Sequence, residues 1–233
     1  HHGLGAVVVS FLARWCDVIR LALLIARKDL RIEWRSRVLV WQVAPFSIMA
    51  LVIAGLAVGP DVAMGRRLAP GLLYLVTTFV ALQVIARSHA AESSAGTVTS
   101  VMTLGLDGGA VYLGKVMALF THLVIVLSAL VVTASVLFHI HAREVLVASP
   151  TLILSLAAMA SSGVLYGALT KGSGSLLPVI ALPALAPVLI AGERSMTAVI
   201  HGGPLARWVT LLGVMVAAYG AVGVLLYGAV EET

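Results

Sequence analysis

Cysteine and charge are both scarce in this chain of 233 residues, which has one cysteine and 11% charged residues. The single cysteine, Cys16, excludes an internal disulfide and a multi-thiolate metal site, and we expect it to face the cytoplasm as a free thiol. Soluble domains have about 25% charged and about 45–50% apolar residues, whereas 61% of this chain is hydrophobic and its mean hydropathy is +1.08. Because one soluble core cannot bury so much apolar surface, the chain is predicted to be an integral membrane protein.

Paired carboxylates for acid–base catalysis are also missing, and no Ser–His–Asp arrangement is recognisable. The stretch GAVYLGKV nearly matches a phosphate-binding loop, since Gly109, Gly114 and Lys115 have the right spacing. Val116, however, stands where Mg²⁺ requires a serine or threonine hydroxyl. We therefore expect no catalytic residue and no bound cofactor, and any ATP and Mg²⁺ that drive this protein must be bound by another subunit.

Histidines are the remaining candidates for a metal or ligand site. His139 and His141 lie two residues apart, a spacing that points them to different sides of a helix, so they make a poor joint metal site. His122 falls inside a predicted membrane span, where ionisable groups are rare. It is either a packing histidine, with Thr121 as a neighbouring hydrogen-bond group, or a contact on a substrate pathway.

Six apolar runs are long enough to be membrane-spanning helices, which need about 20 residues. Together they predict an all-α integral membrane protein, and they cover residues 38–58, 70–86, 116–137, 152–169, 176–191 and 208–230. The fifth run contains Pro183 and Pro187, each of which removes a backbone hydrogen bond. That helix is expected to be kinked or broken, either as part of a pathway or as a static kink that fits the packing.

The positive charges predict how the chain lies in the membrane. If the N-terminus is inside, ten lysines and arginines fall on inner segments and five on outer ones, which places both termini in the cytoplasm. The net charge of +5 does not indicate nucleic-acid binding, because the cations cluster beside apolar runs and fit a lipid surface better. The outer cations are Arg66, Arg67, Arg143, Arg194 and Arg207.

A stripe of apolar residues precedes the first span. Its members recur every three or four residues, and most charges lie around the other side of the helix. This pattern predicts a helix over residues 13–35 that lies in the membrane interface, with an ordinary positively charged flank as the alternative. Residues 1–12 are expected to be a frayed lead-in. The stripe consists of Trp15, Ile19, Leu23, Ala26, Leu30 and Trp34.

The longest inner connection, residues 88–109, separates the second and third spans. We expect a short helix to start near Glu92, Ser93 and Ser94 and to end at the glycines 105, 108 and 109. A short amphipathic helix without chemistry of its own suits docking to a cytosolic partner. The alternative is a plain surface loop.

An interfacial helix, six spans and a short inner helix between the second and third resemble the permease of type-2 ABC exporters. Four stretches add detail, and together they resemble the CcmB family, the heme exporter protein B of cytochrome c maturation. They are RKDLRIEWRSR, RRLAPGLLYL, the segment 87–115 with Glu92 and Gly96, and LPVIALPALAPVLIAG. The resemblance covers nearly the whole chain from residue 26 and implies one permease domain, residues 1–233, in the bacterial inner membrane.

The resemblance also implies partners and site residues. It implies a cytosolic ATPase, CcmA, with the membrane subunits CcmC and CcmD and the heme chaperone CcmE. We also expect this chain to form a homodimer. ATP hydrolysis by the partner would drive release of the heme-loaded chaperone, so heme is handled by the complex. The residues that would couple to the ATPase are Glu92, Gly96, Thr97, Val98, Val101 and Leu104. The alternatives are a generic exporter of lipid, polysaccharide or drug, and a membrane scaffold that transports nothing.

Overall fold

The computed structural model describes the backbone of residues 2–36, 39–95, 108–170 and 176–232. Side chains are described for residues 18–35, 41–88, 108–170 and 177–227. Within these residues the chain is helical and contains no strand, in agreement with the predicted all-α membrane protein.

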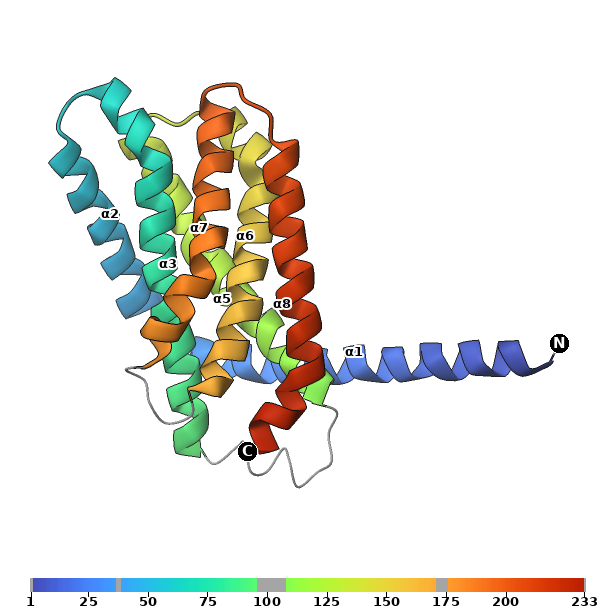
Figure 1. Ribbon diagram of the computed structural model, residues 1–233. Coiled ribbons are helices and arrows are strands. Elements are labelled where there is room, and N and C mark those ends of the chain that lie inside the picture. The colour runs from blue at the N-terminus through green and yellow to red at the C-terminus, as the bar shows by residue number, and fades with distance from the viewer. Residues whose placement is uncertain (1, 37–38, 96–107, 171–175, 233) are drawn as a thin grey trace.

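Six helices in the described part of the chain are long and apolar enough to cross a membrane, as the sequence predicted. They form an upright bundle (Figure 1). Their bounds are α2 Ala44–Val58, preceded by the short π-helix η1 Leu39–Val43, then α3 Val62–Ala95, α5 Gly108–Leu137, α6 Ala142–Leu169, α7 Leu176–Ile200 and α8 Ala206–Glu232.

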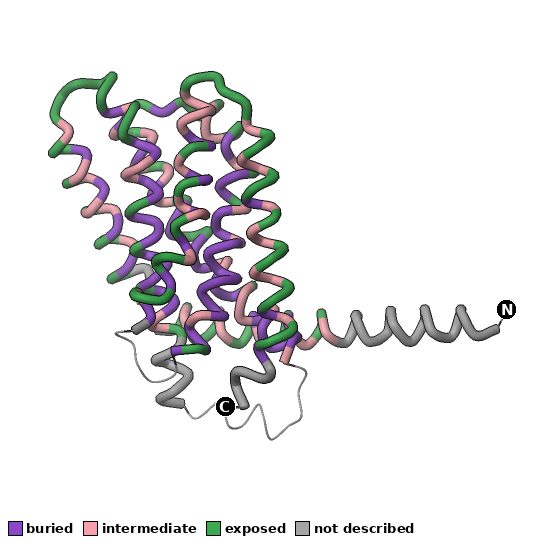
Figure 2. The backbone as a smooth tube through the Cα atoms, in the orientation of Figure 1, coloured by how far each residue is buried: buried purple, intermediate pink, exposed green. Residues whose placement is uncertain are grey.

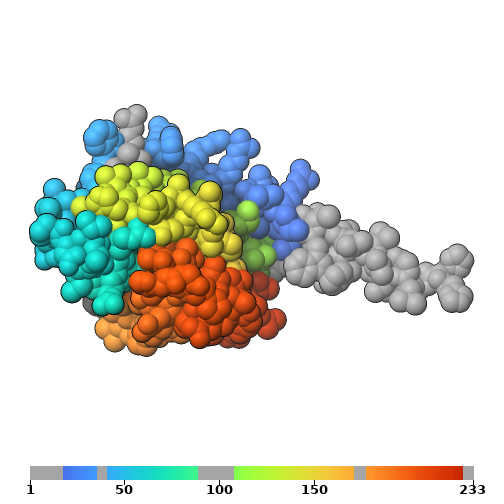
Figure 3. Space-filling view, turned by 90° about the horizontal axis from the view of Figure 1, so that it is seen from above, coloured from blue at the N-terminus to red at the C-terminus, as the bar shows by residue number. Residues whose placement is uncertain are grey.

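Helix α1, His2–Ser36, crosses one end of this bundle almost at right angles to the other helices (Figure 1). We call this end, where the C-terminus also lies, the α1 end, and the other the opposite end. Viewed from above, α1 lies along one side of the bundle (Figure 3). The expected frayed lead-in is wrong, because the helix already begins at His2. Continuous helix satisfies the backbone of an apolar segment without help from water.

Helix α3 extends beyond the predicted span of 70–86 in both directions. At its start, Asp61 Oδ1 accepts hydrogen bonds from the amides of Ala63 (2.9 Å) and Met64 (3.2 Å), which satisfies donors that a helix start leaves free. At its other end the helix runs through Glu92 to Ala95. Glu92 to Ser94 are therefore the last turn of α3, and the prediction that they begin a separate helix is wrong.

Helix α7 contains Pro183 and Pro187 yet remains one helix, which excludes the predicted break. It is bent, as Figure 1 shows, and it extends nine residues beyond the predicted end at residue 191. Between the two prolines, the Tyr219 hydroxyl of α8 donates to the Ala184 carbonyl over 2.7 Å. A neighbouring helix thus supplies a hydrogen bond where prolines disturb the ladder, as membrane helices tolerate.

The core is centred on α6, which packs against α3, α5, α7 and α8. Buried positions follow α6 and α3 along most of their length, whereas α8 is exposed on its outward side (Figure 2). Small residues allow this close packing: Ser162 is fully buried, and a Cβ at Gly163 would overlap with Ile85 of α3. The stretch Ser161–Gly163 is therefore a close contact between α6 and α3.

Candidate functional site

The residues predicted to couple to an ATPase fall at the edge of the described structure. Glu92 lies in the last turn of α3, but its side chain is outside the described residues. The other five, Gly96, Thr97, Val98, Val101 and Leu104, lie outside the described residues altogether. The described structure shows what this segment is joined to: it leaves α3 at Ala95 and enters α5 at Gly108.

Helix α5 is the junction of the fold. Along its length it packs against α1, α2, α3, α6 and α8, so a displacement of the whole helix reaches five other helices. Side chains in a close-packed interior have few voids to absorb such a displacement. The start of α5 is therefore one of the two places, with the end of α3 at Ala95, where a force on the segment 96–107 would enter the bundle.

Tyr112 lies in the first turns of α5 and is buried, with 1% of its surface exposed. Its hydroxyl lies 3.0 Å from the carbonyl oxygen of Ser161 on α6 and 3.0 Å from that of Tyr219 on α8. Its ring packs on Tyr227 at 5.6 Å between centroids, and a Cβ at Gly223 would overlap with it. One side chain therefore joins α5 to both α6 and α8.

Lys115 follows one turn later, with its ammonium group 5.3 Å from the centre of the Tyr227 ring. A cation over an aromatic ring is attracted by the negative face of the ring. The observed contact joins α5 to α8 near the α1 end.

The crossing of α1 and α5 is unusually close. Ala22 and Ala26 are buried there, and a Cβ at Gly114 of α5 would lie 2.8 Å from the Ala22 carbonyl oxygen. Farther along both helices, His122 of α5 is buried, and Asp29 and Glu33 of α1 are half-buried. Thr121 does not bond to His122 in the structure, since its hydroxyl donates to the Met117 carbonyl over 2.8 Å.

The predicted apolar stripe of α1 is divided between two environments. Ala26 is buried against the bundle, and Leu30 is half-buried. Ile19, Leu23 and Trp34 are exposed, Trp34 by 74%. The side chain of Trp15 lies outside the described residues. An exposed apolar face beside a bundle of membrane-spanning helices suits contact with lipid.

A second buried tyrosine, Tyr74 of α3, lies nearer the opposite end. Its hydroxyl is 3.3 Å from Ser155 Oγ on α6, and a Cβ at Gly192 of α7 would overlap with its ring. The sequence analysis missed Tyr74, Tyr112 and Tyr219. The signal available was a hydroxyl-bearing aromatic inside an apolar run, since a buried Tyr usually finds a hydrogen-bond partner.

The opposite end is held by charge. Arg66 of α3 makes an ion pair of 2.6 Å with Glu144 of α6, and it also donates to the His139 carbonyl oxygen. Glu144 Oε2 in turn accepts from the His141 amide over 2.8 Å and so caps α6. His139 has a positive φ of 53° in the turn between α5 and α6. The two histidines therefore belong to a corner that ties α3 to α6.

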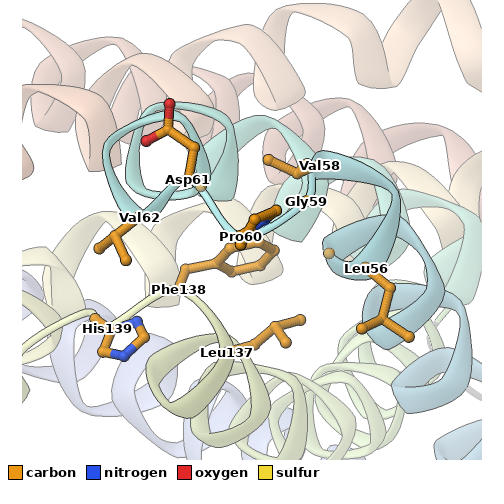
Figure 4. A pocket seen from close by; sticks show the side chains of 11 residues that line it. Leu56, Val58, Gly59, Pro60, Asp61, Val62, Leu137, Phe138 and His139 are labelled. Atoms are coloured by element: carbon orange, nitrogen blue, oxygen red, sulfur yellow. The ribbon is translucent and has the colours of Figure 1, made fainter.

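A pocket of about 370 Å³ lies beside this corner, between the α2–α3 turn and the end of α5 (Figure 4). Leu56, Val62 and Phe138 contribute apolar walls, and Asp61 and His139 contribute polar groups. Among the residues that the structure describes, no three His, Cys, Asp or Glu side chains gather in a way that would hold a metal ion.

Comparison with known proteins agrees with this architecture. The profile of the family described as "CcmB protein" matches residues 20–230. The chain is similar to "Heme exporter protein B" of Rhodobacter capsulatus, with 30% identity over 154 residues, which cover 64% of this chain and 70% of the relative. It is also similar to proteins of the same name from Shigella flexneri and Escherichia coli K12, each with 26% identity over 196 residues, covering 83% of this chain and 89% of the relative.

Proposed function

The chain belongs to the CcmB family, and from this premise we propose that it is the membrane subunit of an ATP-driven complex that handles heme during cytochrome c maturation. A partner ATPase, CcmA, binds ATP and Mg²⁺ and hydrolyses the ATP. The relatives named "Heme exporter protein B" support heme as the molecule that the complex handles. The work of the complex is release of the heme-loaded chaperone CcmE, in association with CcmC and CcmD.

The observation that carries this proposal is the position of α5. The helix starts directly after the segment 96–107 and packs against five other helices. Binding of ATP closes the partner ATPase on the segment 88–109, and the first turn of α5 transmits that displacement to the bundle. The bound nucleotide drives this change only if it favours one packing of the helices over another.

The proposal includes the arrangement in the membrane. The α1 end faces the cytoplasm of a bacterial cell, with both termini on that side of the inner membrane, and two copies of the chain form the permease. The position of the basic residues supports this: Arg87, Lys115 and the cations of α1 lie toward the α1 end, while Arg66 and Arg194 lie toward the opposite end.

The first test is coupling. The chain is co-expressed with the neighbouring ATPase and chaperone genes, and ATP-dependent release of the heme-loaded chaperone is measured for Glu92→Ala and Gly96→Leu. We expect release to fall while the bundle still assembles. Arg194→Ala, an exposed residue at the opposite end, is the matched control and should leave release unchanged. Unchanged release in both segment variants, with the ATPase still bound, would contradict coupling through this segment.

The second test is topology. A Ser93→Cys variant, in a chain whose native Cys16 is replaced by serine, is exposed to an impermeant thiol reagent in inverted and in right-side-out vesicles. The proposal requires labelling from the cytoplasmic face. Labelling from the other face alone would place the coupling segment on the wrong side for a cytosolic ATPase.

A further inference from the structure

The position of Tyr112 places a buried polar group at the entrance to the bundle. It lies four residues after Gly108, where the chain leaves the coupling segment and α5 begins. It has 1% of its surface exposed and is among the largest fully buried side chains. A buried hydroxyl must be hydrogen-bonded, because leaving it unsatisfied removes its favourable interaction with water.

The hydroxyl of Tyr112 has two acceptors at the same distance and a single hydrogen to donate. The Ser161 carbonyl of α6 and the Tyr219 carbonyl of α8 each lie 3.0 Å away, so at any moment only one can receive a fully directed bond. If α6 and α8 shift relative to one another, the hydroxyl keeps a partner in either arrangement. Neither arrangement then leaves the buried hydroxyl without a hydrogen-bond partner.

The ring of Tyr112 is held on the α8 side. Gly223 leaves room that any Cβ would fill, and the Tyr227 ring packs at 5.6 Å and 48°. Because this contact is so close, a movement of the first turn of α5 must displace α8 or rotate the ring. When α8 moves, the distance from the hydroxyl to the α8 carbonyl changes, and so does the strength of its hydrogen bond to the α6 carbonyl, since both carbonyls compete for the same hydrogen.

Tyr74 provides the internal contrast. It is equally buried and also faces a glycine on another helix, Gly192. Its hydroxyl, however, lies near a side-chain hydroxyl, Ser155 Oγ at 3.3 Å, which can rotate to follow it. It also lies 21 residues from the end of α3 at Ala95, remote from the coupling segment.

We propose that Tyr112 is the positioning residue that passes movement of the α5 start to α6 and α8, its hydroxyl donating to the Ser161 carbonyl in one packing and to the Tyr219 carbonyl in the other. This inference rests on the proposed function, since it names the residue through which the ATPase acts on the bundle. It assigns no contact with ATP or with heme to Tyr112.

The test compares Tyr112→Phe with Tyr74→Phe in the complete complex with its ATPase. Each variant keeps the ring and removes one buried hydroxyl, so thermal unfolding should shift to a similar extent in both. ATP-dependent release of the heme-loaded chaperone should fall about tenfold in Tyr112→Phe, because the connection that passes movement from α5 to α6 and α8 loses one buried hydrogen bond. It should fall less than twofold in Tyr74→Phe.

Hydrogen exchange keeps the proposal testable if Tyr112→Phe does not assemble. In the wild-type complex, a non-hydrolysable ATP analogue should change amide protection together in the α6 peptide around Ser161 and the α8 peptide around Tyr219. A change confined to α5, or equal loss of release in the two Phe variants, would overturn the role of Tyr112. A wild-type complex that binds no ATPase would instead contradict the proposed function itself.

Discussion

The two ends of the helix bundle are fastened by different kinds of contact. At the opposite end, Arg66 joins α3 to Glu144 of α6 and to the His139 carbonyl, and Glu144 also caps its own helix. Near the α1 end, the contacts between helices include a tyrosine hydroxyl shared by two carbonyls, the Lys115 ammonium over the Tyr227 ring and the close approach of Gly114 to α1. Ionic contacts with several bonds resist displacement more than single neutral bonds do. The comparison indicates one end fastened by an ion pair between α3 and α6 and one fastened mainly by the packing of tyrosines against α6 and α8.

The largest effect is expected where packing is tightest at the α1 end. Gly223→Val places a branched side chain in the space of the Tyr112 ring and should destabilise the chain by about 3 kcal/mol, the cost of overpacking a core. Gly220→Val is the matched control, because no atom outside its own helix lies within 4 Å of a Cβ at Gly220. Unfolding of both variants in detergent, followed by tryptophan fluorescence, measures the difference; equal destabilisation would show that this crossing is loose.

The next effect should appear at the opposite end. Glu144→Ala leaves the Arg66 guanidinium, whose side chain is only 23% exposed, without its carboxylate and removes the cap of α6. The free energy of unfolding should fall by about 2 kcal/mol. Arg143→Ala, at the exposed neighbouring residue, should leave it nearly unchanged. The difference is measured by the same unfolding assay. If Glu144→Ala unfolds like the unmodified chain, the ion pair does not fasten this end.

A smaller loss of stability is expected from overpacking the crossing of α1 over α5. Ala22→Leu inserts a large side chain at a buried position and is expected to cost about 1.5 kcal/mol and to lift α1 from α5. Trypsin should then cleave faster after Arg20 and Arg27. Leu23→Ala alters an exposed position of the same turn, so its cleavage rate should match that of the unmodified chain. Equal cleavage in the two variants would remove the case for a close crossing.

The smallest effect is expected from Arg207, which lies over the Trp208 ring at 4.6 Å at the opposite end. Arg207→Ala removes this contact and should lower the free energy of unfolding by about 0.5 kcal/mol, because the site is exposed. A small shift of the tryptophan emission should accompany it. Arg67→Ala, another exposed cation at that end, serves as the control. A loss as large as that of Glu144→Ala would mean that the ion pair at the corner has no special role.

Hydropathy located all six spans but misplaced their ends. The predicted second span began at residue 70 because Arg66 and Arg67 are polar, yet α3 begins at Val62. A helix continues as long as its backbone bonds and caps are satisfied, and Asp61 supplies that cap. The prolines of α7 bend the helix, which is one of the two predicted outcomes, but they do not break it, and the Tyr219 hydroxyl of another helix contributes a hydrogen bond in that region.

The candidate site was predictable only in outline. A long connection between the second and third spans follows from the order of apolar runs, and its residues 96–107 are outside the described structure. The tyrosine contacts were not predictable, because Tyr112 depends on Gly223, 111 residues later in the chain. A pattern within a short stretch of sequence cannot link two residues that lie so far apart in the chain.

The sequence by itself determined that this chain is a bundle of apolar helices with an amphipathic helix before it, since length and hydrophobicity alone decide what spans a bilayer. Only the tertiary structure decided that α5 packs against five other helices and that an ion pair joins α3 to α6 at the opposite end. It alone also showed that one tyrosine hydroxyl joins α5 to α6 and α8 near the α1 end. The physical reason is that membrane insertion depends on the composition of each segment, whereas contacts between helices depend on which small residue faces which large one.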